Sequence, residues 1–268
     1  MGSECAPALA YFHFPYRATS ENVVAKWKTD RISTAARTFK AIIVGYLGPN
    51  RRIYSLLEAL VQLDARKRFQ FHVYGPVWDE KQLLQRIEEY RLQNIVFLHG
   101  STPSGRLDAL IADADLAINL RYPTMGEASM SQLQIWDHEL PSIVTRTGWY
   151  ATMPENTALS VEIEREIDDL KRHLTAFAER PELFSSLGVN GRRTLIEHHA
   201  PERYVADFLA FCEETTAWRA NSAMLGSAAR AGRQLGSLFG DAATSPLLDG
   251  IADTLHALYS ERRIGARA

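Results

Sequence analysis

The sequence predicts an α/β fold, in which a doubly wound, Rossmann-like parallel sheet of about six strands has helices on both faces. The first observation is that short apolar runs alternate with stretches whose apolar residues recur at helical spacing. Such alternation joins consecutive strands by helical crossovers, which makes the strands parallel. The second observation is that glycine and polar residues follow the apolar runs, at the strand ends where ligands bind in this fold.

The expected strands are short apolar runs, at residues 41–47, 70–75, 95–98, 116–120, 142–145 and 157–161. Between the first two runs, leucines recur at helical spacing over residues 56–63. From Ile163 to Trp218 the pattern is helical, with Pro181 and Pro201 at places where new helices begin. We therefore expect three parts, namely a lead-in segment over 1–38, a Rossmann-like domain over 39–218 and a C-terminal helical extension over 219–268 with no assigned function.

Composition and charge exclude several classes of function. Of the 268 residues, 46% are hydrophobic and the formal net charge is −2, so the overall balance attracts neither nucleic acid nor an anionic membrane. Cys5 and Cys212 form no disulfide framework, and the eight histidines form no metal-ligand motif. No apolar run approaches the roughly 18 residues that span a bilayer, and we expect no secretory signal. We expect a cytoplasmic protein without a metal or cofactor, and leave a peripheral position at the inner membrane open.

The stretch over residues 115–150 contains the most chemistry. A buried strand there leads into a polar loop with Arg121, Gly126 and Glu127, and we expect a helix over 129–139 to follow. A strand that delivers a glycine-containing loop to a helix N-terminus presents backbone N–H groups and the positive end of the helix dipole to a phosphate. This loop is therefore a candidate anion site.

A second glycine-containing turn follows the first expected strand. Gly45 and Gly48 allow the backbone to approach a diphosphate, and Asn50 and Arg51 begin the next helix. A guanidinium binds phosphate oxygens in a bidentate way. The alternative for both arginines is a solvated helix start. We place Arg51 at the anion and Arg52 at the surface.

Two motifs resemble a known family. They are LRYPTMGEAS, followed by a helix, LPSIV and a Thr-Gly-Trp-Tyr turn, and the upstream run IIVGYLGPNRR at 42–52. In this order they resemble the C-terminal, donor nucleotide-sugar-binding domain of the glycogen-synthase-like, group 1 retaining glycosyltransferases of the GT-B fold. The resemblance extends over residues 38–216.

The resemblance implies roles for the residues at the first and third strand ends. Family members carry a Gly-Arg pair and then a lysine in the first turn. Arg51 matches the lysine, whereas Tyr46 stands where the arginine is expected. The loop at Gly100 edges the nucleobase pocket in the family, so backbone groups there are expected to contact the base. We give the neighbouring His99 no acid or base role.

The resemblance also implies roles around the fourth strand end. Family members usually carry a glutamate that contacts the donor sugar and a second one that contacts the ribose. Here Gly126 takes the first position, with Glu127 one residue later, and Gln134 takes the second. Some members have a Gly-Glu-x-Ser loop, so Glu127 is expected to bind the sugar. The backbone N–H groups expected to face the phosphates are those of Ala128, Ser129 and Met130.

Alternatives stay open for two charged residues of this loop. Glu127 is either the sugar ligand or a plain carboxylate stabilised by the helix dipole. Arg121 either neutralises the diphosphate leaving group or pairs with Glu127. If the family mechanism applies, Glu127 and Arg51 are the candidate catalytic residues.

The implied reaction is the retaining, metal-independent transfer of a hexosyl group from a UDP-, GDP- or ADP-linked sugar, in polysaccharide or cell-envelope synthesis. Such an enzyme also needs an acceptor domain, for which residues 1–38 are too short. A separate acceptor domain and a second copy of the chain therefore stay open as partners. The main alternative is a non-catalytic nucleotide-sugar-binding or protein-interaction module. Another doubly wound enzyme, such as a nucleotide-sugar epimerase, is a further alternative.

Overall fold

A computed structural model describes residues 10–21, 23–24, 38–215 and 230. The chain divides into two units, one over residues 13–204 and the other over 1–12 together with 205–268. In the smaller unit the ring of Phe12 lies edge-on to Phe208 and Phe211, with centroids 6.0 and 5.6 Å away. The predicted extension over 219–268, apart from position 230, and much of the lead-in segment lie outside the described residues.

The larger unit contains one sheet of six parallel strands in the order β3-β2-β1-β4-β5-β6, which confirms the predicted fold class. The strands are β1 Phe39–Val44, β2 Phe69–Tyr74, β3 Val96–Leu98, β4 Leu116–Asn119, β5 Ser142–Thr145 and β6 Leu159–Val161. The strand order reverses at β1, which pairs with β2 on one side and with β4 on the other. Ligands bind beside such a reversal, at the carboxyl ends of the strands.

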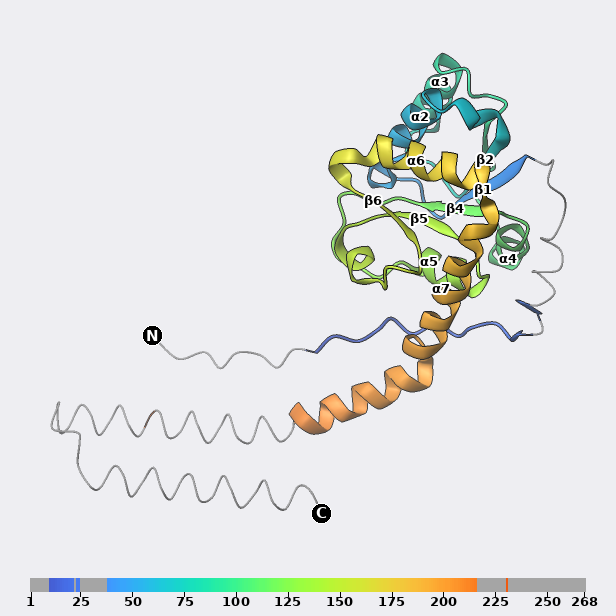
Figure 1. The fold of residues 1–268 in the computed structure, drawn as a ribbon. Coiled ribbons are helices and arrows are strands. Elements are labelled where there is room, and N and C mark those ends of the chain that lie inside the picture. The colour runs from blue at the N-terminus through green and yellow to red at the C-terminus, as the bar shows by residue number, and fades with distance from the viewer. Residues whose placement is uncertain (1–9, 22, 25–37, 216–229, 231–268) are drawn as a thin grey trace. The chain divides into compact units, whose positions relative to one another are not determined.

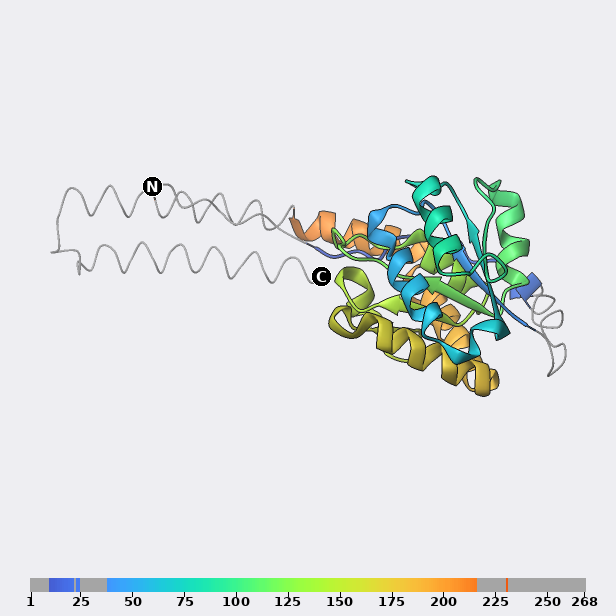
Figure 2. The same ribbon diagram turned by 90° about the horizontal axis from the view of Figure 1, so that it is seen from above.

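Helices cover both faces of this sheet, as Figure 1 shows. The α-helices are α2 Ile53–Val61, α3 Glu80–Glu89, α4 Ser104–Ala112, α5 Met130–Asp137, α6 Glu166–Glu179 and α7 Ser185–His198, and residues 201–215 are also helical. The 3-10 turns are η1 Pro49–Arg51, η2 Asp64–Arg68, η3 Gly148–Thr152, η4 Ile163–Arg165 and η5 Pro181–Phe184. Both views place α2 beside α6 on one face, while α4, α5 and α7 cover the other (Figure 2).

The central strands are buried on both faces because helices cover each side. All four residues of β4 and of β5 are buried. On the α2 and α6 face, the rings of Phe39, Phe69 and Phe177 pack with centroids 5.3 to 6.3 Å apart. This rigid core fixes where each strand ends, and therefore where each following loop begins.

The lead-in residues from 13 to 19 pack against α5 and α7. The Asp137 carboxylate, at the end of α5, accepts the N–H of Thr19 at 3.0 Å and its hydroxyl at 2.7 Å. Arg192 of α7 pairs with the same carboxylate, and both side chains are buried. Within the described residues, no helix combines the length and apolar character needed to cross a membrane.

Candidate functional site

The loop after β1 turns sharply at Gly45, which has a φ of +95° and donates its N–H to the Tyr74 carbonyl at 2.9 Å. A Cβ at Gly75 in the neighbouring loop would lie 2.0 Å from the Gly45 carbonyl oxygen, so this approach of the two loops requires glycine at position 75. Gly48 then precedes the single turn η1. The loop is thereby fixed against the sheet edge and delivers the end of η1 to the carboxyl end of β1.

Arg51, the last residue of η1, is buried, with only 6% of its surface exposed. Its Nη2 donates to the Val44 carbonyl at 3.0 Å, whereas Nε is excluded from solvent and has no hydrogen-bond partner within the described chain. Burial lowers the pKa of Arg51, and the charge of Arg121 lowers it further while Tyr150 opposes both effects. The solvated helix start considered from the sequence is therefore wrong for Arg51.

Arg52 is not a plain surface residue, which corrects the sequence-based placement. It has a φ of 54° and precedes α2, and its side chain pairs with the buried Glu166 at the start of α6. The Nε–Oε2 distance is 2.9 Å and the Nη2–Oε2 distance 2.7 Å. Because a buried carboxylate needs a partner, Arg52 has a structural role, tying the β1 loop to α6. The helix itself begins at Ile53, after the turn at Arg51.

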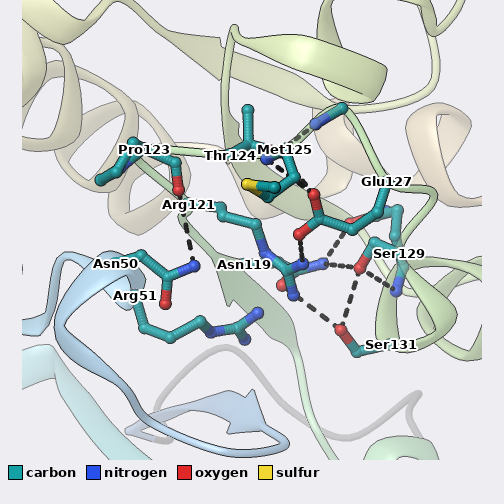
Figure 3. Close-up of polar contacts among 12 residues, drawn as sticks. Asn50, Arg51, Asn119, Arg121, Pro123, Thr124, Met125, Glu127, Ser129 and Ser131 are labelled. Carbon is teal, nitrogen blue, oxygen red and sulfur yellow. Dashed lines mark hydrogen bonds and ion pairs between the residues drawn. The ribbon is translucent and has the colours of Figure 1, made fainter.

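Arg121 begins the loop after β4, and its N–H donates to Thr145 Oγ1 on β5 at 3.0 Å. Its guanidinium pairs with Glu127, while its Nε is buried and has no hydrogen-bond partner among the described residues. The Glu127 carboxylate also accepts from the Thr124 hydroxyl at 3.0 Å and from the Met125 N–H at 2.9 Å (Figure 3). The N–H of Glu127 itself, followed by Arg121 and these two donors, lowers the pKa of Glu127 to about 2. The carboxylate is thus ionised at neutral pH and folds the loop onto Arg121.

Helix α5 starts at Met130 and ends at Asp137, so it is shorter than the predicted span of 129–139. Its N-cap is Ser129, whose hydroxyl accepts the N–H of Gln132 at 3.3 Å. Glu127 precedes the helix and accepts hydrogen bonds from its own loop instead. The interpretation of Glu127 as a helix-start carboxylate is therefore wrong.

The β1 and β4 loops meet at this edge of the sheet. The Tyr122 N–H donates to the Asn50 carbonyl at 2.8 Å, and the Asn50 side chain reaches the Pro123 carbonyl at 3.5 Å. In Figure 3 the guanidinium groups of Arg51 and Arg121 converge from the two loops, each with an Nε donor left over. Two cations with spare donors in one place suit an anion that carries several oxygens.

Sequence reasoning missed a buried polar network beneath these loops. Asn119, the last residue of β4, donates to the Gln132 side-chain oxygen at 3.0 Å, and Gln132 Nε2 donates to the Ser142 hydroxyl at 2.9 Å. All three side chains are almost fully buried. The available signal was a pair of amide residues, one ending an apolar strand run and one on the apolar side of the following helix. This network joins β4, α5 and β5 and holds the base of the loop.

The structure brings Gly45, Gly48, Asn50, Arg51, Arg121 and Glu127 to one edge. Gly100, with a φ of +65°, follows β3, which β2 separates from β1. Gln134 is half-buried on α5, and the described residues offer its side chain no hydrogen bond. The other predicted residues of the loop differ in exposure, with Gly126 and Met130 exposed, Ala128 half-buried and Ser129 buried.

A cavity of about 430 Å³ lies beside η3, with Arg146, Tyr150 and Glu155 among its lining residues. A smaller one of about 210 Å³ is lined in part by His13, Trp136 and His199. Within the described ranges, no three histidine, cysteine, aspartate or glutamate side chains gather so that they could hold a metal ion.

Comparisons with solved structures show the same architecture. TarM of S. aureus, as a point mutant in complex with fondaparinux, α-GlcNAc-glycerol and UDP, matches 67% of this chain at 19% identity and a TM-score of 0.56. HepE of Anabaena, in complex with UDP and glucose, matches 72% at 16% identity and a TM-score of 0.58. The C-terminal domain of the group 1 glycosyl transferase LpcC from Francisella tularensis matches 70% at 16% identity and a TM-score of 0.55.

The match covers a different share of each neighbour's own chain. The match takes in 36% of the TarM chain and 53% of the HepE chain, but 96% of the isolated LpcC domain. No curated protein matches this chain in sequence. The family model described as "Glycosyl transferases group 1" matches residues 26–194, which is more than half of the chain. The chain therefore belongs to the group 1 glycosyl transferase family.

Proposed function

We propose that this chain is the donor-binding half of a retaining glycosyltransferase that transfers a hexosyl group from a nucleotide-diphosphate sugar without a metal ion. In this proposal residues 39–218 form the donor-binding domain, and a separate domain or chain supplies the acceptor. The acceptor would be a polysaccharide or another cell-envelope glycan, reached from the cytoplasmic side. Family membership and the six-stranded fold support the activity, and the architecture shared with LpcC, HepE and TarM supports the donor half.

One observation supports this proposal more than any other, namely the pair of guanidinium groups at the ends of β1 and β4. Arg51 is buried next to a second cation and keeps an Nε donor without a partner in the described chain. Burying a cation without a counter-charge is unfavourable, and so is burying an unused donor. A bound diphosphate would relieve both costs at once, because it brings negative charge and several acceptor oxygens.

The proposed reaction uses these groups electrostatically. When the bond between the sugar and the diphosphate breaks, negative charge develops on the leaving phosphate, and Arg51 and Arg121 would stabilise it. Backbone N–H groups at Gly48 and the start of α5 would add donors to the same phosphates. Glu127 would accept a hydrogen bond from a sugar hydroxyl, while Gln134 would contact the ribose and the Gly100 loop the base.

The nucleotide is most directly suggested by the structural neighbours. TarM was solved with UDP and HepE with UDP and glucose. We therefore expect UDP to bind more tightly than GDP or ADP, and this is tested by calorimetric titration of the full chain with each of the three. Arg51→Ala should weaken the binding of UDP by about 1.5 to 3 kcal/mol, the range for a charged hydrogen bond. The matched control is Arg193→Ala, which removes an exposed arginine from α7.

Glu127→Ala separates the phosphate contacts from the sugar contacts. Glu127 pairs with Arg121, so its removal frees that guanidinium and should leave the affinity for bare UDP unchanged or higher. Binding of UDP-glucose should instead weaken relative to UDP. Equal losses for both ligands would show that Glu127 acts through the shape of the loop, and that it does not bind the sugar.

A non-catalytic nucleotide-sugar-binding module is the second candidate, and one observation favours it. Tyr46 stands where family members carry an arginine, and its side chain is 52% exposed, with its ring packed near Gly48. One phosphate-binding charge is therefore replaced by an aromatic ring. Tyr46→Arg should strengthen UDP binding if the site resembles the family site. Saturable binding of UDP-glucose with no transfer to any acceptor, even with an acceptor domain supplied in trans, would favour the module.

A further inference from the structure

Tyr150, in the turn η3 after β5, has a buried hydroxyl that no described residue uses. The side chain is 2% exposed, and its hydroxyl oxygen is excluded from solvent and has no hydrogen-bond partner in the described residues. The ring is held in place by Trp149, with centroids 5.4 Å apart. An unpaired buried hydroxyl costs free energy, and a ligand that accepts its hydrogen bond would remove that cost.

The turn that carries Tyr150 packs directly on the loop of Arg121. A Cβ at Gly148 would lie 2.6 Å from the Thr124 methyl carbon and 3.3 Å from the Cα of Gly126, and Gly148 has a φ of 52°. Only glycine therefore allows the two segments to touch. The β5 strand itself holds this loop, through the Thr145 hydroxyl that accepts the Arg121 N–H. The end of β5 is thus built into the same site as the ends of β1 and β4.

An ionised Tyr150 would raise the pKa of the buried Arg51. Three buried donors without partners in the described chain, two guanidinium Nε–H groups and one phenol O–H, therefore come from three consecutive positions in the order β1-β4-β5. A ligand that satisfies all three must offer several acceptor oxygens and negative charge. A neutral sugar hydroxyl supplies no charge, whereas a phosphate supplies both.

We propose that the Tyr150 hydroxyl donates a hydrogen bond to a phosphate oxygen of the diphosphate that Arg51 and Arg121 hold. This assignment rests on the proposed donor-binding function and adds a third side-chain donor, from β5, to that site. It makes Tyr150 a binding residue. Its ring packs on Trp149. A substitution that keeps the ring and removes the oxygen isolates this contribution.

The test is Tyr150→Phe in the full chain, titrated calorimetrically with inorganic pyrophosphate, UDP, GDP and ADP. We expect the dissociation constant of each diphosphate that binds the wild type to rise roughly tenfold, as for one hydrogen bond to a charged group. Uridine, which has no phosphate, measures any change in base binding and should be unaffected. Tyr54→Phe is the matched control. The Tyr54 hydroxyl on α2 already donates to the Gln82 side-chain oxygen at 2.8 Å, so its removal should not change diphosphate binding.

Thermal unfolding of the ligand-free variant separates a binding role from a packing role. Since the phenylalanine leaves no unpaired oxygen, the melting temperature of Tyr150→Phe should equal or exceed that of the wild type. A fall of several degrees, which corresponds to roughly 1 kcal/mol or more in a domain of this size, would mean that the hydroxyl supports the fold and would overturn the assignment.

The remaining outcomes distinguish this inference from the proposed function. If the wild type binds a diphosphate and Tyr150→Phe binds it equally well, the assignment of Tyr150 is wrong and the donor-binding function stands. If the wild type binds none of the four probes, both proposals fail together. A tenfold loss that also appears with uridine would show that the ring, and not the hydroxyl, contributes.

Discussion

Two buried arginines of the same domain have opposite surroundings. Arg192 of α7 is 5% exposed, and its guanidinium donates to the Asp137 carboxylate, to the Asp137 carbonyl at 2.7 Å and to the Thr19 carbonyl. Arg51 is 6% exposed, donates to one carbonyl, and lies beside Arg121 with no ion pair to any described carboxylate. The two arginines are thus similarly buried, but Arg192 has a carboxylate partner and Arg51 has none among the described residues.

The difference indicates what each arginine is for. A buried guanidinium in a structural role needs a counter-charge and acceptors for its donors, and Arg192 has both. A guanidinium that lacks them, such as Arg51, is unfavourable by itself, and under the proposed function a ligand supplies its acceptors. The comparison therefore predicts that substitution of Arg192 changes the stability of the fold, whereas substitution of Arg51 changes ligand binding.

The largest effect should follow from Arg192→Met, which keeps much of the side-chain volume and removes the charge. The buried Asp137 carboxylate would keep only the Thr19 and Tyr16 donors and lose its counter-charge. We expect the free energy of unfolding to fall by about 3 to 5 kcal/mol, the cost of breaking a buried ion pair. Urea unfolding at pH 7 measures it. A loss below about 1 kcal/mol would mean that pairing with a buried carboxylate does not distinguish a structural arginine from a ligand-binding one.

Gln132→Leu should have the next largest effect, because it breaks a closed network within the candidate site. Asn119 and Ser142 would each lose a buried hydrogen bond of 3.0 or 2.9 Å. We expect a loss of about 2 to 3 kcal/mol in the free energy of unfolding. Gln134→Leu, on the same helix and only half-buried, is the matched control and should cost less than about 1 kcal/mol. Equal losses for the two variants would show that the hydrogen bonds of the network do not stabilise the fold.

The fold could be predicted from the sequence because its strands repeat one simple pattern. Runs such as LAIN and SIVT are buried on both faces, so they are mostly apolar, and each ends at a polar residue. The strand ends follow from that pattern less well at β1, which ends at Val44, three residues before the predicted run over 41–47 ends. The right-handed crossover rule narrows the possible strand orders, but the order β3-β2-β1-β4-β5-β6 comes from the structure.

The candidate site could be predicted only in part, because its chemistry depends on contacts between distant residues. Arg51 and Arg52 are identical neighbours in the sequence, and only the position of Glu166 shows which one is paired. Tyr150 follows an apolar strand like any core aromatic residue, and nothing local marks its hydroxyl as unpaired. The sequence left open whether Arg121 neutralises a diphosphate or pairs with Glu127, and the structure shows the pair with Glu127.

Arg51→Met sharpens the comparison with Arg192→Met, since the same substitution is made at a similarly buried position. It removes one hydrogen bond to the Val44 carbonyl but also an uncompensated buried charge. We expect the free energy of unfolding of the ligand-free protein to change by less than about 1 kcal/mol in either direction. Urea unfolding at one fixed UDP concentration should then separate the two proteins, because the variant binds UDP more weakly and gains less stability from it. A loss as large as that of Arg192→Met would place Arg51 among the structural arginines.

The smallest effect should follow from removing the charge of Glu127, which pairs with Arg121. The folded-state pKa of Glu127 lies near 2, below the ordinary value of about 4.3, so its ionised form is stabilised by folding. This contribution is fully present above pH 4.3 and is lost as the pH falls through about 2. Because the side chain is 42% exposed, solvent screens the interaction, and Glu127→Gln should cost only about 0.5 to 1 kcal/mol at pH 7.

Urea unfolding at pH 7, 4 and 3 should show that this loss of stability becomes smaller as the pH falls. Glu155→Gln, which removes an exposed carboxylate, should show no such trend. A cost that stays constant down to pH 3 would mean that Glu127 contributes by shape alone, which would leave Arg121 without an electrostatic partner, like Arg51.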